Sequence, residues 1–142
     1  MKVSSFIFCA FTATWIIVLG WAIWPISPPL SFIEDDAIWP KVVKVGEQIT
    51  IARTFTVVRS DPVTIIRALI KGDCSKTCET VDLPSSLVHL DEGHRRTQTR
   101  DFILPMTVDP GEWRVASIIQ WTDRIGRSHR LALKELPFTV VP

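Results

Sequence analysis

The chain has 142 residues, with 16 Lys and Arg against 15 Asp and Glu, and 46% of its residues are hydrophobic. This near-neutral balance argues against the strongly basic surface that nucleic-acid binding requires, and the length suits one domain with one core. The chain contains no Asn, so composition also excludes N-glycosylation.

The amino-terminal region is the least polar part of the sequence. Between Lys2 and Glu34 it carries no charged residue, and the run from Phe6 to Trp24 has nineteen mostly apolar residues. As a helix this run would be about 28 Å long, close to the roughly 30 Å hydrocarbon thickness of a bilayer. Trp21 and Trp24 stand at its far end, where indoles favour the headgroup layer. We therefore predict a transmembrane helix over residues 6–24 that contacts the lipid bilayer.

Orientation follows from the charges that flank this run. Lys2 is expected to hold a cytoplasmic tail of residues 1–5 inside the cell. The helix would then act as a signal-anchor of a single-pass protein in a bacterial inner membrane, with the carboxyl-terminal part in the periplasm. The alternative is a signal peptide cleaved after Ala22, within the small-residue pattern Gly20-Trp21-Ala22, which would release a periplasmic or secreted module.

Prolines dominate the next segment. Pro25, Pro28, Pro29 and Pro40 disfavour a sustained helix, so residues 25–40 are predicted to form an extended tether. Beyond the tether, β-branched runs alternate with turn signals at short intervals, which predicts an all-β domain over residues 41–142.

Seven strands are expected in that domain. In the second of them, Ile49, Ile51, Phe55 and Val57 share one face at period two, whereas Arg53 breaks the face and is expected near a sheet edge with its guanidinium in water. Pro84 places the fourth strand at an edge, because proline cannot donate to a ladder. The predicted strands are 41–45, 48–59, 63–71, 80–90, 95–104, 112–121 and 131–140.

One stretch carries a resemblance to known domains. From Leu104 to Val115, a Pro110-Gly111 turn precedes Trp113, which resembles the turn and following strand of immunoglobulin-like and fibronectin type III domains. The resemblance implies a Greek-key arrangement, and hence a seven-stranded immunoglobulin-like β-sandwich.

Cys74 and Cys78 are the most specific chemical feature of the predicted domain. They are four residues apart, which does not match a thioredoxin-like Cys-x-x-Cys motif, and the three histidines are too scattered to complete a zinc site. We predict a disulfide, which would stabilise a hairpin tip by about 2 kcal/mol and implies an oxidising compartment.

Two basic groups flank predicted turns. Counting strand directions places the turns near Ser60, Glu92 and Gly126 at the end where the domain begins, and the Cys74 tip at the other end. The candidate binding patch at the first end would face anionic lipid headgroups or an envelope protein. Alternatively, these side chains pair with nearby acids such as Asp123. The patch comprises His94, Arg95, Arg96, Arg124, Arg127 and Arg130, with Arg100 and His129 beside it.

No nucleophile motif, phosphate loop or metalloprotease pattern is present in the sequence. We therefore predict a non-enzymatic protein without cofactor or metal, whose exported β-sandwich binds a protein or a membrane surface in a cell envelope of bacterial or phage-accessory type. A hydrolase or redox protein with an unrecognised site is the remaining alternative, and readily labelled cysteines would indicate the redox version.

Overall fold

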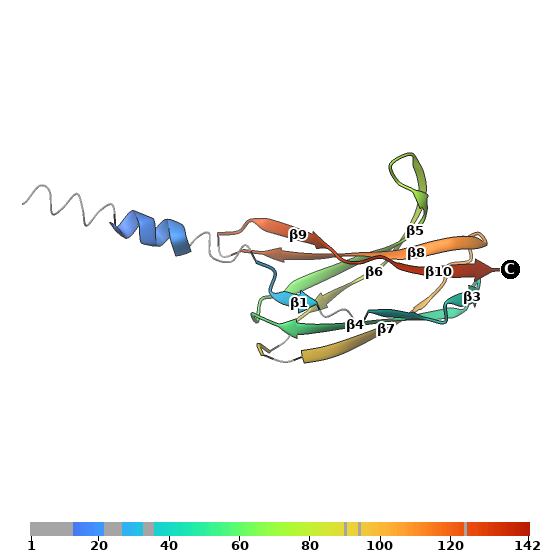
Figure 1. Ribbon diagram of the computed structural model, residues 1–142, viewed down its shortest axis with the longest axis horizontal. Helices are drawn as coiled ribbons and strands as arrows, with labels where there is room; N and C mark the ends of the chain where they lie inside the picture. Colours follow the sequence, from blue (N-terminus) through green and yellow to red (C-terminus); the bar gives the residue numbers. More distant parts are fainter. Residues whose placement is uncertain (1–12, 22–26, 33–35, 90, 94, 124) are drawn as a thin grey trace, which may run out of the picture.

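A computed structural model shows ten strands in two sheets that pack face to face (Figure 1). It describes residues 13–21, 27–32, 36–89, 91–93, 95–123 and 125–142, and the strand count refers to these. The β-sandwich architecture predicted from the sequence is confirmed.

Sheet A has four strands. Its centre is β4 (Gln48–Val57). One edge of β4 pairs with two short strands in succession, with β1 (Leu30–Phe32) near its carboxyl end and with β2 (Ala37–Trp39) near its amino end. The other edge of β4 pairs with β7 (Arg95–Ile103) over nine consecutive residue pairs. All of these pairings are antiparallel.

Sheet B has six strands. Its longest ladders join β8 (Gly111–Thr122) to β5 (Val63–Asp73), and β5 to the edge strand β6 (Thr77–Val88). The opposite side of β8 pairs with β9 (Ser128–Ala132) and then β10 (Leu136–Val141). The short β3 (Val42–Lys44) lies parallel to β10, after a cis Trp39–Pro40 peptide bond carries the chain from sheet A to sheet B.

The core consists of two separate hydrophobic clusters. Alternate residues of β4, β5 and β8 point inward, as period-two strands require. One cluster includes Ile51, Leu69 and Val115, and the other includes Phe55 and Ile119. Between them, the inward positions on these same strands are polar: Arg53 on β4, Arg67 on β5 and Ser117 on β8.

The predicted membrane helix is not supported. The described helix covers residues 13–21 only, and nine residues rise about 14 Å, roughly half of a bilayer's hydrocarbon core. Among the described parts of the chain, no helix is both long and apolar enough to cross a membrane. The predictions of a transmembrane helix over 6–24, a signal-anchor and a single-pass inner-membrane location are therefore wrong, while the tail 1–5 lies outside the described residues.

Two further expectations differ from the structure. Part of the segment predicted as a tether belongs to sheet A, because β1 and β2 pair with β4. The last predicted strand is two strands, since the chain crosses residues 133–135 between β9 and β10 without strand pairing. These differences raise the predicted seven strands to ten.

The two ends of the sandwich are as expected from the strand directions. Glu92 N donates to Ser60 Oγ at 3.1 Å, and Arg59 Nη2 donates to the Ser27 carbonyl at 2.9 Å, so both turns lie at the end that the segment predicted as a tether reaches. The strand that opens the predicted domain, β3, pairs with the last residues of β10. The β5–β6 hairpin projects from the other end (Figure 1), and the predicted Cys74–Cys78 disulfide closes its tip. Pro84 does lie on an edge strand, β6.

Candidate functional site

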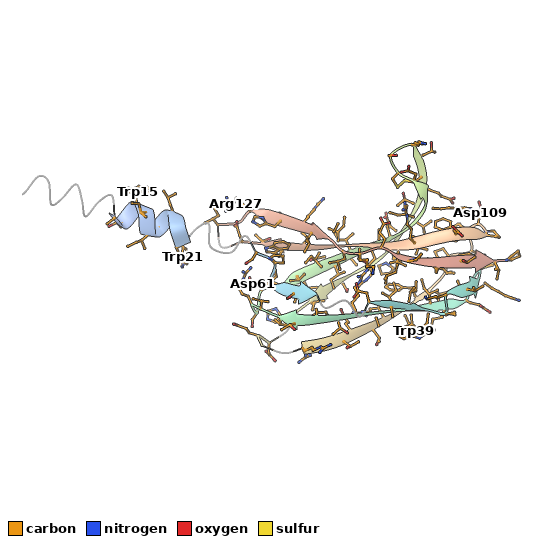
Figure 2. All side chains as sticks on the ribbon, in the orientation of Figure 1. Trp15, Trp21, Trp39, Asp61, Asp109 and Arg127 are labelled. Carbon is orange, nitrogen blue, oxygen red and sulfur yellow. A yellow bond between two sulfur atoms is a disulfide. The ribbon has the colours of Figure 1, made fainter. Side chains whose placement is uncertain are left out.

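The predicted basic patch is only partly described. Arg95 and Arg96 begin β7, and Arg130 lies on β9. Figure 2 places Arg127 and Asp61 at the same end of the sandwich, and Asp109 at the opposite end. His94 and Arg124 lie outside the described residues. Because no helix of the described residues can cross a membrane, nothing in the structure orients this end toward a bilayer.

The Asp123 carboxylate organises the hairpin that carries part of this patch. It accepts hydrogen bonds from Arg127 Nε at 2.8 Å, from His129 Nε2 at 2.9 Å and from Ile125 N at 3.0 Å, with its side chain fully buried. Burial alone would raise the pKa of Asp123, but the bonds from His129, Arg127 and Ile125 together hold it well below its ordinary value. Arg127 and His129 are thus engaged within the protein, as the pairing alternative expects.

Arg53 lies in the core and not at a water-exposed edge, which corrects the expectation from the sequence. It is 4% exposed on the central strand β4 and forms an ion pair with Asp36. Its Nη2 donates to Ser117 Oγ at 3.3 Å and to the Lys134 carbonyl at 3.0 Å. Burial lowers the pKa of Arg53, and Asp36 opposes that shift. Its charge is therefore compensated from within the fold.

Arg67 faces Arg53 from the opposite sheet and is also 4% exposed. Its Nη1 donates to Ser86 Oγ at 2.8 Å, and its guanidinium carbon lies 5.6 Å from the centroid of the Phe102 ring. No carboxylate of the described residues forms an ion pair with it. Burial, followed by repulsion from Arg100 and Arg53, lowers the pKa of Arg67 to about 10. This buried charge has no compensating anion within the described structure.

A β-bulge places Ser86 against Arg67. Ile65 pairs with Ser86 and Arg67 pairs with Leu83, so two residues of β6 lie opposite one residue of β5. The inward parity of β6 therefore switches: Leu83 and Ser86 are both buried, whereas Leu87 is 71% exposed. The two residues opposite Ile66 are Pro84 and Ser85, and a bulge tolerates proline because it needs no ladder N–H there.

We name the buried polar residues between the two hydrophobic clusters the arginine layer: Arg53, Arg67, Ser86 and Ser117. The exposed Arg100 of β7 lies beside this layer. Where the layer reaches β6 and β7 it opens into a groove of about 140 Å³, called the β6–β7 groove. A second, much smaller space of about 10 Å³ inside the sandwich is lined by all three arginines. The residues lining the groove are Arg67, Pro84, Ser85, Ser86, Arg100, Asp101 and Phe102.

Sequence reasoning missed this site, although a signal existed. Arg67 stands at period two with Val63, Ile65 and Leu69, just as Arg53 does among the apolar residues of β4. Two charges at inward positions of two strands that follow each other in the chain predict a polar layer across a sandwich core. The sequence does not contain the bulge geometry that brings Ser86 to Arg67.

The chemistry of this arrangement is recognition of negative charge. Guanidinium groups are donors without acceptor capacity and remain protonated at neutral pH, so they suit carboxylates and oxyanions. Within the part of the chain that the structure describes, no group of three or more His, Cys, Asp or Glu side chains could hold a metal ion.

Comparisons with known proteins support the fold and no closer relationship. No family model matches the chain, and no curated protein matches it. Among solved structures it resembles the alkylpurine DNA glycosylase AlkC of Pseudomonas fluorescens, bound there to DNA containing an abasic site analog, with a TM-score of 0.53 and 16% identity. The match covers 89% of this chain but 33% of the glycosylase, so the chain spans about a third of that protein.

Two weaker resemblances have TM-scores below 0.5 and add nothing to this conclusion. The sporulation control protein Spo0M of Bacillus subtilis matches with a TM-score of 0.45 and 12% identity over 82% of this chain and 51% of its own. The PapD-like domain 7 of human CEP192 matches with a TM-score of 0.43 and 15% identity, over 82% of this chain and 91% of that domain. At these identities the likeness concerns the β-sandwich alone.

Proposed function

We propose that this chain is a non-enzymatic binding domain of immunoglobulin-like type that receives an extended, acidic protein segment along β7. The strand order supports the type: β1, β4 and β7 correspond to strands A, B and E, and β5, β8 and β10 to C, F and G. In this domain β6 attaches to β5, which leaves β7 as an edge of sheet A.

The observation that carries the proposal is the combination of a regular free edge with positive charge. β7 pairs with β4 without a register shift, and no described strand pairs with its other edge. Such an edge can accept an added strand through its backbone. Arg96 and Arg100 lie exposed on this strand, and Arg100 also lines the β6–β7 groove. Charge complementarity therefore selects an acidic partner.

The same charges have a second interpretation, which the experiment must separate from binding. Arginines on an edge strand also hinder unwanted pairing between copies of a protein. A protective role predicts that no acidic segment docks, whereas a binding role predicts saturable docking with β7 at its centre.

The test is a titration of the isotope-labelled full chain with a peptide of alternating Glu and Thr, followed by amide NMR. We expect saturable shifts concentrated in residues 95–103, and binding at least about tenfold weaker in Arg96→Glu, as expected for reversing a charge at an interface. Arg130→Glu on β9 is the matched control and should bind normally. Equal shifts with an alternating Lys and Thr peptide, or preferential binding of a single-stranded oligonucleotide, would overturn the proposal.

A further inference from the structure

We propose that Arg67 and Arg100 form a binding site for one anionic group, a carboxylate or a small oxyanion, in the β6–β7 groove. The proposal deepens the proposed function, on which it rests for the natural source of the ligand: an acidic side chain of the segment docked on β7. The site itself is a property of the two arginines and can be tested without any peptide.

The position of Arg67 is fixed by its neighbours. Its side chain is buried between the sheets, Ser86 Oγ accepts its hydrogen bond at 2.8 Å, and the Phe102 ring packs against the guanidinium. A guanidinium has five N–H donors in a planar fork, and the bond to Ser86 uses one of them. Among the described residues, the guanidinium of Arg67 makes no other hydrogen bond than this one to Ser86. A carboxylate or oxyanion can therefore take two parallel donors, the strongest geometry for such a pair.

The charge balance of the arginine layer favours an anion on this side. Three guanidinium groups lie in or beside the layer, and the carboxylate of Asp36 pairs with Arg53. Arg67 and Arg100 repel each other, which is one cause of the lowered pKa of Arg67. An anion between them would remove this repulsion and compensate the buried charge.

The dimensions of the groove limit the ligand. About 140 Å³ holds a few water molecules, hence one carboxylate or one tetrahedral oxyanion with residual water. Pro84 and Phe102 supply apolar walls, which strengthen the electrostatic interaction by excluding solvent. Asp101 also lines the groove, but its Oδ1 accepts a hydrogen bond from Thr50 Oγ1 at 2.7 Å on β4.

The experiment titrates the full chain with sodium sulfate and, separately, with sodium acetate, each against sodium chloride at equal ionic strength. The readouts are the side-chain Nε–H resonances of the arginines and the melting temperature. We expect a saturable shift of the Arg67 resonance with sulfate or acetate, and a larger rise in melting temperature than chloride gives. Affinity should fall at least fivefold in Arg100→Gln and be lost in Arg67→Gln, while Arg130→Gln keeps it.

Each other outcome is decisive. Shifts that grow linearly with salt, or that persist in Arg67→Gln, would overturn the anion site. If Arg67→Gln fails to fold, Arg100→Gln and the resonance of Arg67 in the unaltered chain still decide the question. Peptide docking on β7 that is unchanged in Arg100→Gln would overturn this inference while the proposed function stands. Saturable sulfate binding without any peptide docking would establish the site and remove the proposed function.

Discussion

Arg53 and Arg67 are equally buried arginines that differ in their partners: a carboxylate neutralises Arg53, whereas no described carboxylate pairs with Arg67. Both side chains are 4% exposed, and they approach the middle of the core from opposite sheets. Arg53 is held by Asp36, Ser117 and the Lys134 carbonyl. Arg67 is held by Ser86 and lies against Phe102. The Asp36 carboxylate neutralises Arg53, and we call this the closed side of the arginine layer. Arg67 lines the β6–β7 groove, and we call this the open side.

The difference separates a buried charge that stabilises the fold from a buried charge that is available to bind an external anion. A buried ion pair with further hydrogen bonds is complete, so its loss is felt in stability. A buried cation without a carboxylate carries an uncompensated desolvation cost, and binding of an external anion can offset this cost. Burial and residue type alone would rank the two arginines equally, whereas their partners separate them.

The largest expected effect tests the closed side. Asp36→Asn should lower the free energy of unfolding by about 3 to 5 kcal/mol, because Arg53 would remain buried without a carboxylate. Urea unfolding followed by tryptophan fluorescence measures the change. Asp61→Asn is the matched control: its pair with Arg59 is partly exposed, so about 1 kcal/mol or less should be lost. Equal losses in the two variants would show that Arg53 does not depend on Asp36.

The second prediction compares the two arginines directly. Arg53→Met should cost about 3 kcal/mol or more, because it leaves Asp36 buried without its cation. Arg67→Met leaves only the Ser86 hydroxyl without its partner, so stability should stay within about 1 kcal/mol of the unaltered chain. Parallel denaturation curves measure both. A loss of similar size in Arg67→Met would mean that an internal group compensates Arg67 after all.

The third prediction concerns Asp123, the anionic counterpart of Arg53. Its folded-state pKa lies below its ordinary value of 3.8, so its contribution is present above that pH and is lost as the pH falls through the folded pKa. Between pH 5 and pH 2, the unfolding free energy of Asp123→Asn should therefore fall less steeply than that of the unaltered chain. Identical slopes in the two proteins would show that the hairpin hydrogen bonds do not perturb this carboxylate.

The smallest expected effect tests the open side without a ligand. Arg100→Gln removes a positive charge beside Arg67, and should raise the free energy of unfolding by about 0.5 kcal/mol or less because Arg100 is exposed. The gain should shrink as sodium chloride increases, since salt screens exposed charges. Differential scanning calorimetry at low and high salt measures it, and a clear loss of stability at low salt would contradict the repulsion.

Strand positions were predictable because local pattern decides them. Alternating apolar residues and intervening turns predicted the regions of β4, β5, β7 and β8, and Pro84 predicted the edge strand β6. The prediction of a membrane helix over 6–24 was wrong because it rested on hydropathy. Hydropathy measures how apolar a segment is and does not show that the segment forms a helix long enough to span a bilayer. β1 and β2 were missed, since each has three residues and depends on pairing with β4.

From the amino-acid sequence alone, the β-sandwich and the Cys74–Cys78 disulfide are predicted correctly, because alternating apolar strands and a close cysteine pair are local patterns. The inward spacing of Arg67 is local too, but sequence reasoning did not recognise it. The compensation of Arg53 by Asp36, and the lack of a described carboxylate beside Arg67, become visible once the strands are packed together. These partners lie on different strands, and a bulge in β6 sets which of its side chains point inward. The candidate site is a property of register between sheets, which local propensity does not encode.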